Sequence, residues 1–287
     1  MWFSSWLANR NPSQAGTHGR TPSAPRKRPT FRPRLEALEG RDVPSTLTVT
    51  SAAGDWSAGT LGAAIAAANS GDTIVFNPGL AGQTIHLYPY QLVINKSLDI
   101  EGPGAANLAI SGGNGLRVFE VNPGVQVTLS GLTIEYGNGR QGGYDAALDD
   151  GSGGSILNYG TLTVTGCLVS GDSVNSNAYY GGGIYNAGTL TVSGSTVTQN
   201  IAQILGGGIY NAGTLTVSGS TVTQNIAQSD GGGGGIFNRG TLTVLNSTVI
   251  NNLAPERNHG FVEQDVCTDH QFTFSNKDST IGKVAYF

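Results

Sequence analysis

Short runs in which apolar and polar residues alternate cover most of this 287-residue chain. Each run is three to five residues long, and Gly, Asn or Pro separates most of them. This pattern predicts short β-strands joined by tight turns. Before the repeated part of the chain, the expected strands are 46–50, 73–76, 83–87, 92–94, 98–100, 108–110, 118–121 and 125–129.

The clearest pattern is an internal repeat that runs to Asn252. Residues 181–203 read GGGIYNAGTLTVSGSTVTQNIAQ, and residues 206–228 repeat the same 23 letters, a period of 25. A third copy, GGGIFNRGTLTVLNSTVINN, begins at Gly233, and a looser one, GGSILNYGTLTVTGCLVSG, begins at Gly153. A fixed period of this length indicates a repeat architecture.

The repeat contains strands and no helix. Leu190 and Val192 are expected to point inward, and Thr189, Thr191 and Ser193 to point outward. The other inward positions are Ile184 and Val197. The absence of helical spacing argues against a leucine-rich repeat, and a propeller blade needs about 40 residues. We therefore predict an all-β fold, a right-handed parallel β-helix (solenoid) of about seven turns between Thr73 and Ala254.

Asparagines recur at two positions of the repeat. The first set is Asn158, Asn186, Asn211 and Asn238, and the second is Asn200, Asn225 and Asn252. Stacked amides at a turn can hydrogen-bond along the column. We interpret both sets as ladders; ligand binding by the amides is the alternative.

One short helix is expected at 60–69, before the strands of the stack. Thr60 can cap its start, and Asn69 begins the turn that ends it. The apolar face would consist of Leu61, Ala64, Ile65 and Ala68. We expect this helix to cap the N-terminal end of the solenoid.

The chain divides into three predicted regions. Residues 1–45 form a disordered, basic, Pro/Arg-rich leader, residues 46–254 form the solenoid, and residues 255–287 form a C-terminal cap or a poorly ordered tail. Residues 1–41 hold eight Lys or Arg against two acids, whereas residues 42–254 hold four against twelve. The acidic body offers no basic track for nucleic acid. No apolar run reaches the roughly 18 residues of a transmembrane segment.

Candidate chemistry is sparse, and the best candidate is the insertion 138–154, NGRQGGYDAALDDGSGG. Its relevant residues are Arg140, Tyr144, Asp145, Asp149 and Asp150, with Asp172 one turn later. A lyase on this fold would need an acidic cluster for Ca²⁺ and a Lys or Arg as base. Adjacent Asp149 and Asp150 point to opposite faces of an extended chain, which disfavours a shared metal. Binding of Ca²⁺ or sugar and a merely solvated loop are both left open.

Outside this insertion the sequence contains weaker candidates for catalysis or metal binding. Between Gly181 and Asn252 the only acid is Asp230, so the repeated wall cannot perform acid–base chemistry. The stretch 265–270 contains Asp265, Cys267, Asp269 and His270 but lacks the paired spacing of a zinc site. Cys167 and Cys267 are too few for a disulfide framework, and whether they pair is open. We therefore assign no catalytic, metal-binding or cofactor-binding residue and expect no cofactor.

Two stretches resemble known families. RLEALEGRDVPS (34–45) resembles an N-terminal signature of exported bacterial surface proteins. Residues 60–254, from LGAAIAAANSGDTIVF through the GGGIYNAGTLTV repeats, resemble right-handed parallel β-helix proteins related to polymorphic outer-membrane-protein repeats.

The resemblance implies a non-enzymatic, secreted or cell-surface protein, either a structural scaffold or an adhesive module that contacts polysaccharide or another surface protein. Because pectate-lyase-like enzymes share this fold, a polysaccharide lyase or glycoside hydrolase is the alternative. A degenerate fragment without independent function, or a short member of a longer family, is a third interpretation.

Overall fold

The computed structural model describes residues 43–139, 151–171, 178–230, 232–256, 260–263, 265–268, 272–274 and 280–286. These residues form an all-β parallel solenoid that contains one α-helix, α1 (Leu61–Ala67), and one 3₁₀ turn, η1 (Pro78–Leu80). The predicted all-β solenoid is therefore confirmed. The leader lies outside the described residues except for Val43–Ser45, so its disorder stays a prediction.

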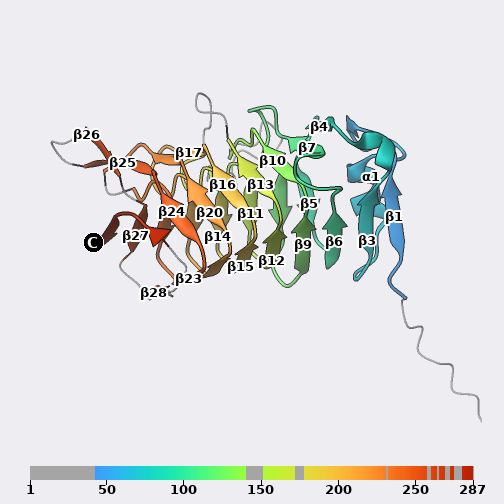
Figure 1. The fold of residues 1–287 in the computed structure, drawn as a ribbon. Coiled ribbons are helices and arrows are strands. Elements are labelled where there is room, and N and C mark those ends of the chain that lie inside the picture. Colours follow the sequence, from blue (N-terminus) through green and yellow to red (C-terminus); the bar gives the residue numbers. More distant parts are fainter. Residues whose placement is uncertain are drawn as a thin grey trace, which may run out of the picture. The chain divides into compact units, whose positions relative to one another are not determined.

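Three long sheets run along the stack, with their strands side by side (Figure 1). Sheet A consists of β1 (Thr46–Val49), β3 (Thr73–Phe76), β6 (Leu98–Glu101), β9 (Gln126–Ser130), β12 (Thr161–Thr165), β15 (Thr189–Ser193), β19 (Thr214–Ser218), β23 (Thr241–Leu245) and β28 (Phe272–Phe274). Sheet B consists of β2 (Ala53–Gly54), β4 (Gln83–Leu87), β7 (Leu108–Ser111), β10 (Thr133–Glu135), β13 (Leu168–Ser170), β16 (Thr196–Thr198), β20 (Thr221–Thr223), β24 (Thr248–Ile250) and β29 (Thr280–Ile281).

Sheet C consists of β5 (Leu92–Ile94), β8 (Phe119–Val121), β11 (Ile156–Asn158), β14 (Ile184–Asn186), β18 (Ile209–Asn211), β22 (Ile236–Asn238), β27 (Val266–Thr268) and β30 (Val284–Tyr286). The short sheet D consists of β17 (Ile201–Ala202), β21 (Ile226–Ala227), β25 (Leu253–Glu256) and β26 (Gly260–Glu263), and β26 is antiparallel to β25. From β3 to β23, sheet A has seven strands, which confirms about seven turns.

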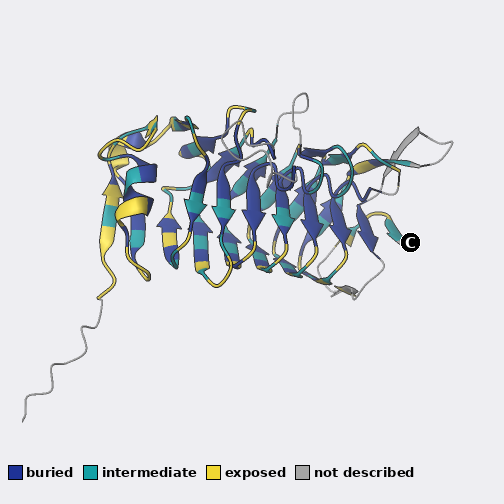
Figure 2. Cartoon of the chain, turned by 180° about the vertical axis from the view of Figure 1, so that it is seen from behind, coloured by how far each residue is buried: buried dark blue, intermediate teal, exposed yellow. Residues whose placement is uncertain are grey.

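The core is the inside of this coil, built by alternation along each strand. The predicted inward residues Ile184, Leu190, Val192 and Val197 have no exposed surface. The register places each over its counterpart, as in Leu190 over Leu215. Each buried Leu or Val contributes about 1.5–3 kcal/mol relative to an exposed one. Figure 2 shows buried segments in every turn of the stack.

Both asparagine ladders form as predicted. Asn158 Nδ2 donates to Asn186 Oδ1 over 2.7 Å, Asn186 donates to Asn211 over 2.7 Å, and Asn211 donates to Asn238 over 2.6 Å. All four residues are fully buried. Because each amide finds its partner one turn away, burying it leaves no lost hydrogen bond.

The second ladder ends on a carboxyl group that the sequence did not reveal. Asn200 and Asn225 each donate from Nδ2 to the next asparagine over 2.9 Å, and Asn252 donates to Asp265 Oδ1 over 2.8 Å. The fully buried Asp265 also accepts the backbone N–H of Lys283 over 2.9 Å. Asp265 thus extends an amide ladder and is not available as an open metal ligand there.

A third column was not predicted and lies between sheets A and B. The backbone N–H of Ser195 donates to Ser220 Oγ over 3.1 Å, and that of Ser220 donates to Ser247 Oγ over 3.0 Å. Cys167 occupies the same position one turn earlier and donates its N–H to Ser195 Oγ. Burial raises the pKa of the Cys167 thiol, which favours its protonated form. Both Cys167 and Cys267 are buried thiols.

The helix α1 lies against β1 and β5. Thr60 Oγ1 accepts the N–H of Ala63, and the predicted apolar face is buried. The helix ends two residues earlier than predicted because the backbone of Ala68 is extended. Lys96 Nζ donates hydrogen bonds to the carbonyl oxygens at this end, those of Ile65, Ala66 and Ala68.

Beyond Ala254 the described strands continue the stack. β27, β28 and β29 pair in parallel with β22, β23 and β24, respectively. The region boundaries, the capping role of α1 and the right-handed winding stay predictions. Among the described residues, no helix has both the length and the apolar character needed to cross a membrane.

The first ladder can be tested at its centre with Asn211→Ala. This change removes the buried hydrogen bonds that Asn211 makes with Asn186, with Asn238 and with the carbonyls of Gly213 and Thr241, and we expect the free energy of unfolding to fall by roughly 3 kcal/mol. Chemical denaturation measures the loss. The exposed Thr214→Ala in the same turn is the control and should change the value by less than about 0.5 kcal/mol. Equal, small effects of both changes would contradict the ladder.

The ionised Asp72 carboxylate should stabilise the N-terminal end of the solenoid, and acid should remove this stabilisation. Hydrogen bonds from the N–H groups of Asn69 and Ser45, aided by the charge of Lys96, lower the pKa of Asp72. A lowered folded-state pKa stabilises the fold above the unfolded value of about 3.9, and the benefit is lost as the pH falls through the folded value. In thermal unfolding, Asp72→Asn should therefore lower Tm at neutral pH, and the difference should vanish in strong acid. A Tm difference that persists at all pH values would refute the ionic origin. The exposed Asp99→Asn is the control, and we expect it to leave Tm unchanged.

Candidate ligand-binding cleft

The Asp-rich insertion, the best candidate in the sequence, is largely untested. Arg140, Tyr144, Asp145, Asp149 and Asp150 lie outside the described residues, as do Asp172, Asp269 and His270. Only the two ends of the insertion, Asn138–Gly139 and Gly151–Gly154, are described. Binding of Ca²⁺ or sugar by these carboxylates therefore stays a prediction.

A buried arginine holds the two ends of the insertion together. Arg117 Nη2 donates to Gly139 O over 3.0 Å and to Ser152 O over 2.6 Å, and its Nε donates to Gly153 O over 3.0 Å. Its Nη1 also lies 3.6 Å from a carboxylate oxygen of Glu120, which compensates the buried charge. One side chain thereby fixes where the insertion leaves and rejoins the stack.

A cleft of about 460 Å³ lies on the outer face of sheet B. Its lining consists of Gly82–Thr84 at β4, Ala105–Ala109 leading into β7, Thr133 and Glu135 on β10, and Leu168 on β13. We call this the sheet B cleft. The strand register places Thr84, Ala109, Thr133 and Leu168 in one row across four neighbouring strands. Its volume falls within the range of about 300–1,000 Å³ that is typical of small-molecule sites.

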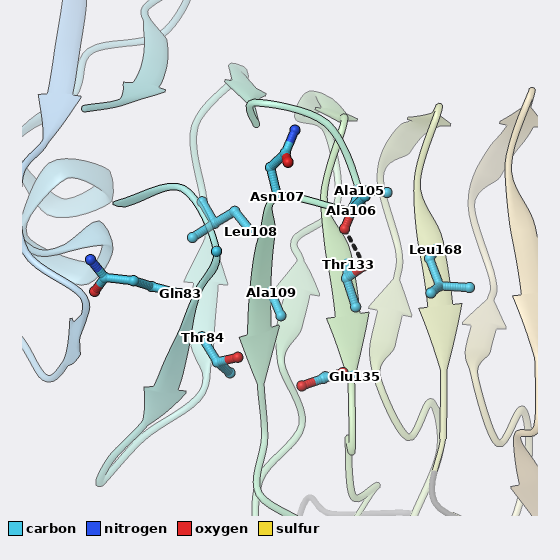
Figure 3. A pocket seen from close by; sticks show the side chains of 11 residues that line it. Gln83, Thr84, Ala105, Ala106, Asn107, Leu108, Ala109, Thr133, Glu135 and Leu168 are labelled. Carbon is cyan, nitrogen blue, oxygen red and sulfur yellow. Dashed lines mark hydrogen bonds between the residues drawn. The ribbon is translucent and has the colours of Figure 1, made fainter. Parts of the chain in front are cut away.

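The loop 102–107, between sheets A and B, forms one wall of the cleft. Gly102 allows its close approach to the next turn, because a Cβ there would lie 2.2 Å from Gly131 O. Gly104 N donates to Gly131 O, and Thr133 Oγ1 donates to Ala105 O over 2.7 Å (Figure 3). These contacts attach the loop to the face of β10.

Glu135 is the charged group that lines the cleft. In Figure 3 its side chain and that of Thr84 point toward one another across Ala109. Burial raises the pKa of the half-buried Glu135, and the nearby His86 opposes this rise. The register places His86, Ser111 and Glu135 in one row on three adjacent strands. Among the described residues, no donor forms a hydrogen bond with the Glu135 carboxylate.

The number of carboxylates in the cleft bears on the glycosidase alternative. A glycosidase of the inverting type needs two carboxylates about 6.5–9.5 Å apart. The described lining of the cleft contains one carboxylate and no Lys or Arg. The cleft therefore offers a single acid with hydrogen-bonding groups around it.

A second hollow, of about 280 Å³, lies beside sheet D. It is lined by one column of exposed amides and one of aliphatic side chains: Gln199, Gln224 and Asn251 beside Ile201, Ile226 and Leu253. No charged residue lines it.

The described residues contain no cluster of three or more His, Cys, Asp or Glu side chains that could hold a metal ion. Cys267 packs beside Phe237 on the outer face of sheet C, where Tyr185, Tyr210 and Phe237 stack with ring centroids 5.0 and 5.4 Å apart. Asp265 therefore belongs to the asparagine ladder, and Cys267 belongs to the packing on sheet C.

Sequence reasoning did not find the sheet B cleft. Glu135 and His86 lie in the irregular N-terminal half, far apart in sequence, where no exact repeat reveals which residues share a row. The available signal was an acid at the outward end of a short strand, Thr133–Glu135, whose other two residues are buried.

Comparisons with known proteins add little. No protein-family model matches the chain, and no curated protein matches it. Among solved structures, the pectate lyase Pel9A is similar, with a TM-score of 0.42 and 12% sequence identity over 85% of this chain and 80% of that chain. A similarity this distant supports no conclusion about the activity of this chain.

Proposed function

We propose that this protein is an exported, non-enzymatic β-helix that acts at the cell surface as a scaffold or adhesive module. The observation that supports the proposal best is the outer face of sheet A. The register aligns Thr128, Thr163, Thr191, Thr216, Thr243 and Thr273 in one column. A second column beside it consists of Thr161, Thr189, Thr214 and Thr241.

Such a face suits adhesion better than catalysis. Strands about 4.8 Å apart repeat the same hydroxyl groups at a fixed interval. Each hydroxyl can donate and accept a hydrogen bond but cannot act as an acid or base near neutral pH. Many weak, identical contacts with a repetitive polymer or protein surface add up through multivalency.

Export rests on the leader. RLEALEGRDVPS (34–45) resembles the signature of exported bacterial surface proteins, and the preceding basic, Pro-rich residues fit a leader. Secretion or surface display is therefore part of the proposal.

The leader proposal predicts where the chain accumulates in a bacterial host that exports such proteins. We expect the full chain in the surface or medium fraction, and a variant that lacks residues 1–45 inside the cells. Immunoblots of fractionated cells with a cytoplasmic marker protein provide the measurement. Recovery of the full chain only in the cytoplasm would argue strongly against the proposed role.

A polysaccharide lyase or glycoside hydrolase is the second candidate. The sheet B cleft with Glu135 favours it, together with the acidic insertion predicted from sequence.

A substrate screen separates the two candidates. With acidic and neutral polysaccharides, with and without Ca²⁺, we expect no turnover, because the described cleft provides a single carboxylate. Reducing-end and unsaturated-product assays measure the outcome. Turnover that is abolished by Asp149→Ala or Asp150→Ala would establish the enzyme and reject the non-enzymatic proposal.

A further inference from the structure

The sheet B cleft lies over the smallest side chain in a row of outward residues. Thr84, Ala109, Thr133, Leu168, Thr196, Thr221 and Thr248 occupy the same row of sheet B. Only at Ala109 is the side chain a single methyl group. The hollow over Ala109 is bounded by Thr84 on one side and Glu135 on the other (Figure 3).

The polar side chains that line the cleft can donate and accept hydrogen bonds, except for the Glu135 carboxylate, which only accepts when it is ionised. Gln83 Nε2 donates to Gly79 O and Asn107 Nδ2 donates to Pro103 O, each over 2.9 Å. Thr133 donates its hydroxyl proton to Ala105 O. Each amide keeps a second N–H, and the amide oxygens, the Thr133 oxygen and the Glu135 carboxylate keep acceptor capacity.

The charge of the cleft lining indicates which charge its ligand carries. Glu135 is half-buried, lies in the cleft, and has no hydrogen-bond donor among the described residues. No Lys or Arg lines the cleft to pair with an anionic ligand. A matching ligand therefore carries several hydrogen-bonding groups and no carboxylate, and an amino group near Glu135 would form a charge-assisted hydrogen bond.

We propose that the sheet B cleft binds a saccharide that bears free amino groups. A sugar ring presents several hydroxyl groups around its edge, which donate and accept hydrogen bonds and so suit the Asn107 amide and the Thr133 hydroxyl. Its C–H face suits the apolar floor of Ala109 and Leu168. A lysine side chain offers a single ammonium on an apolar stem and would leave the other acceptors unused. This inference rests on the proposed interaction role and names its ligand class.

The test is calorimetric titration of the purified full chain with a glucosamine tetramer. The same titration uses its N-acetylated form, a uronate oligomer and tetralysine as comparison ligands. Glu135→Gln removes the charge at nearly constant shape, and Ala109→Phe fills the hollow. The matched controls are the exposed Glu101→Gln on sheet A and Thr221→Phe, which lies in the same row of sheet B outside the cleft.

We expect the wild type to bind the glucosamine tetramer more tightly than its N-acetylated form and not to bind the uronate. Glu135→Gln should weaken binding about tenfold and remove the preference for the free amine. Ala109→Phe should abolish binding, whereas both controls should stay within about twofold of wild type.

Three results would overturn the inference: no binding by the wild type, equal losses in the controls, or tetralysine binding as tight as the sugar with the same sensitivity to Glu135→Gln. If Ala109→Phe fails to fold, Glu135→Gln decides the question. Binding by a chain found only in the cytoplasm would refute the surface role and leave the cleft assignment standing. A surface-displayed chain that binds no amino sugar would refute the cleft assignment alone.

Discussion

In a parallel solenoid, each turn must place its backbone N–H and C=O groups against those of the turn before it, at a spacing of about 4.8 Å. Any backbone group that loses its register is buried without a partner, at a cost of about 1–3 kcal/mol. The rest of this structure depends on that constraint. Identical positions then lie over one another, as Leu162, Leu190, Leu215 and Leu242 do in sheet A. A buried asparagine, unfavourable in isolation, becomes acceptable because its copies lie above and below it.

The same constraint decides where the chain can depart from the repeat. Extra residues fit where the chain leaves one sheet and enters the next, provided that something fixes their ends. At the loop 102–107 the fixing element is the close approach of Gly102 to Gly131. At the insertion 138–154 it is the buried Arg117, which hydrogen-bonds both ends. The regular outer face of sheet A therefore carries uniform hydroxyl groups, and the sheet B cleft lies beside the irregular loop 102–107.

Much of the fold was predictable because a periodic sequence reports its own register. The exact copies at 181–203 and 206–228 identified the inward Leu and Val positions and both ladders before any coordinates. The prediction weakened where copies diverge. Asp265 was considered as a metal ligand, yet it continues an amide ladder, since a carboxylate oxygen accepts the same hydrogen bond as an amide oxygen. The repeat did not mark Ser195 as part of a ladder, although its hydroxyl accepts the N–H of Cys167.

The sequence by itself determined the all-β solenoid, the number of turns, the inward residues of the repeat and the position of the helix. All of these follow from local alternation and from the repeat period, which are properties of neighbouring residues. The tertiary structure alone decided that Thr84, Ala109 and Glu135 surround one hollow, and that Arg117 joins Gly139 to Ser152. Those residues come from different turns, and in the irregular N-terminal half the turn lengths vary. The row that a residue joins there is set by backbone pairing between turns, which no local pattern specifies.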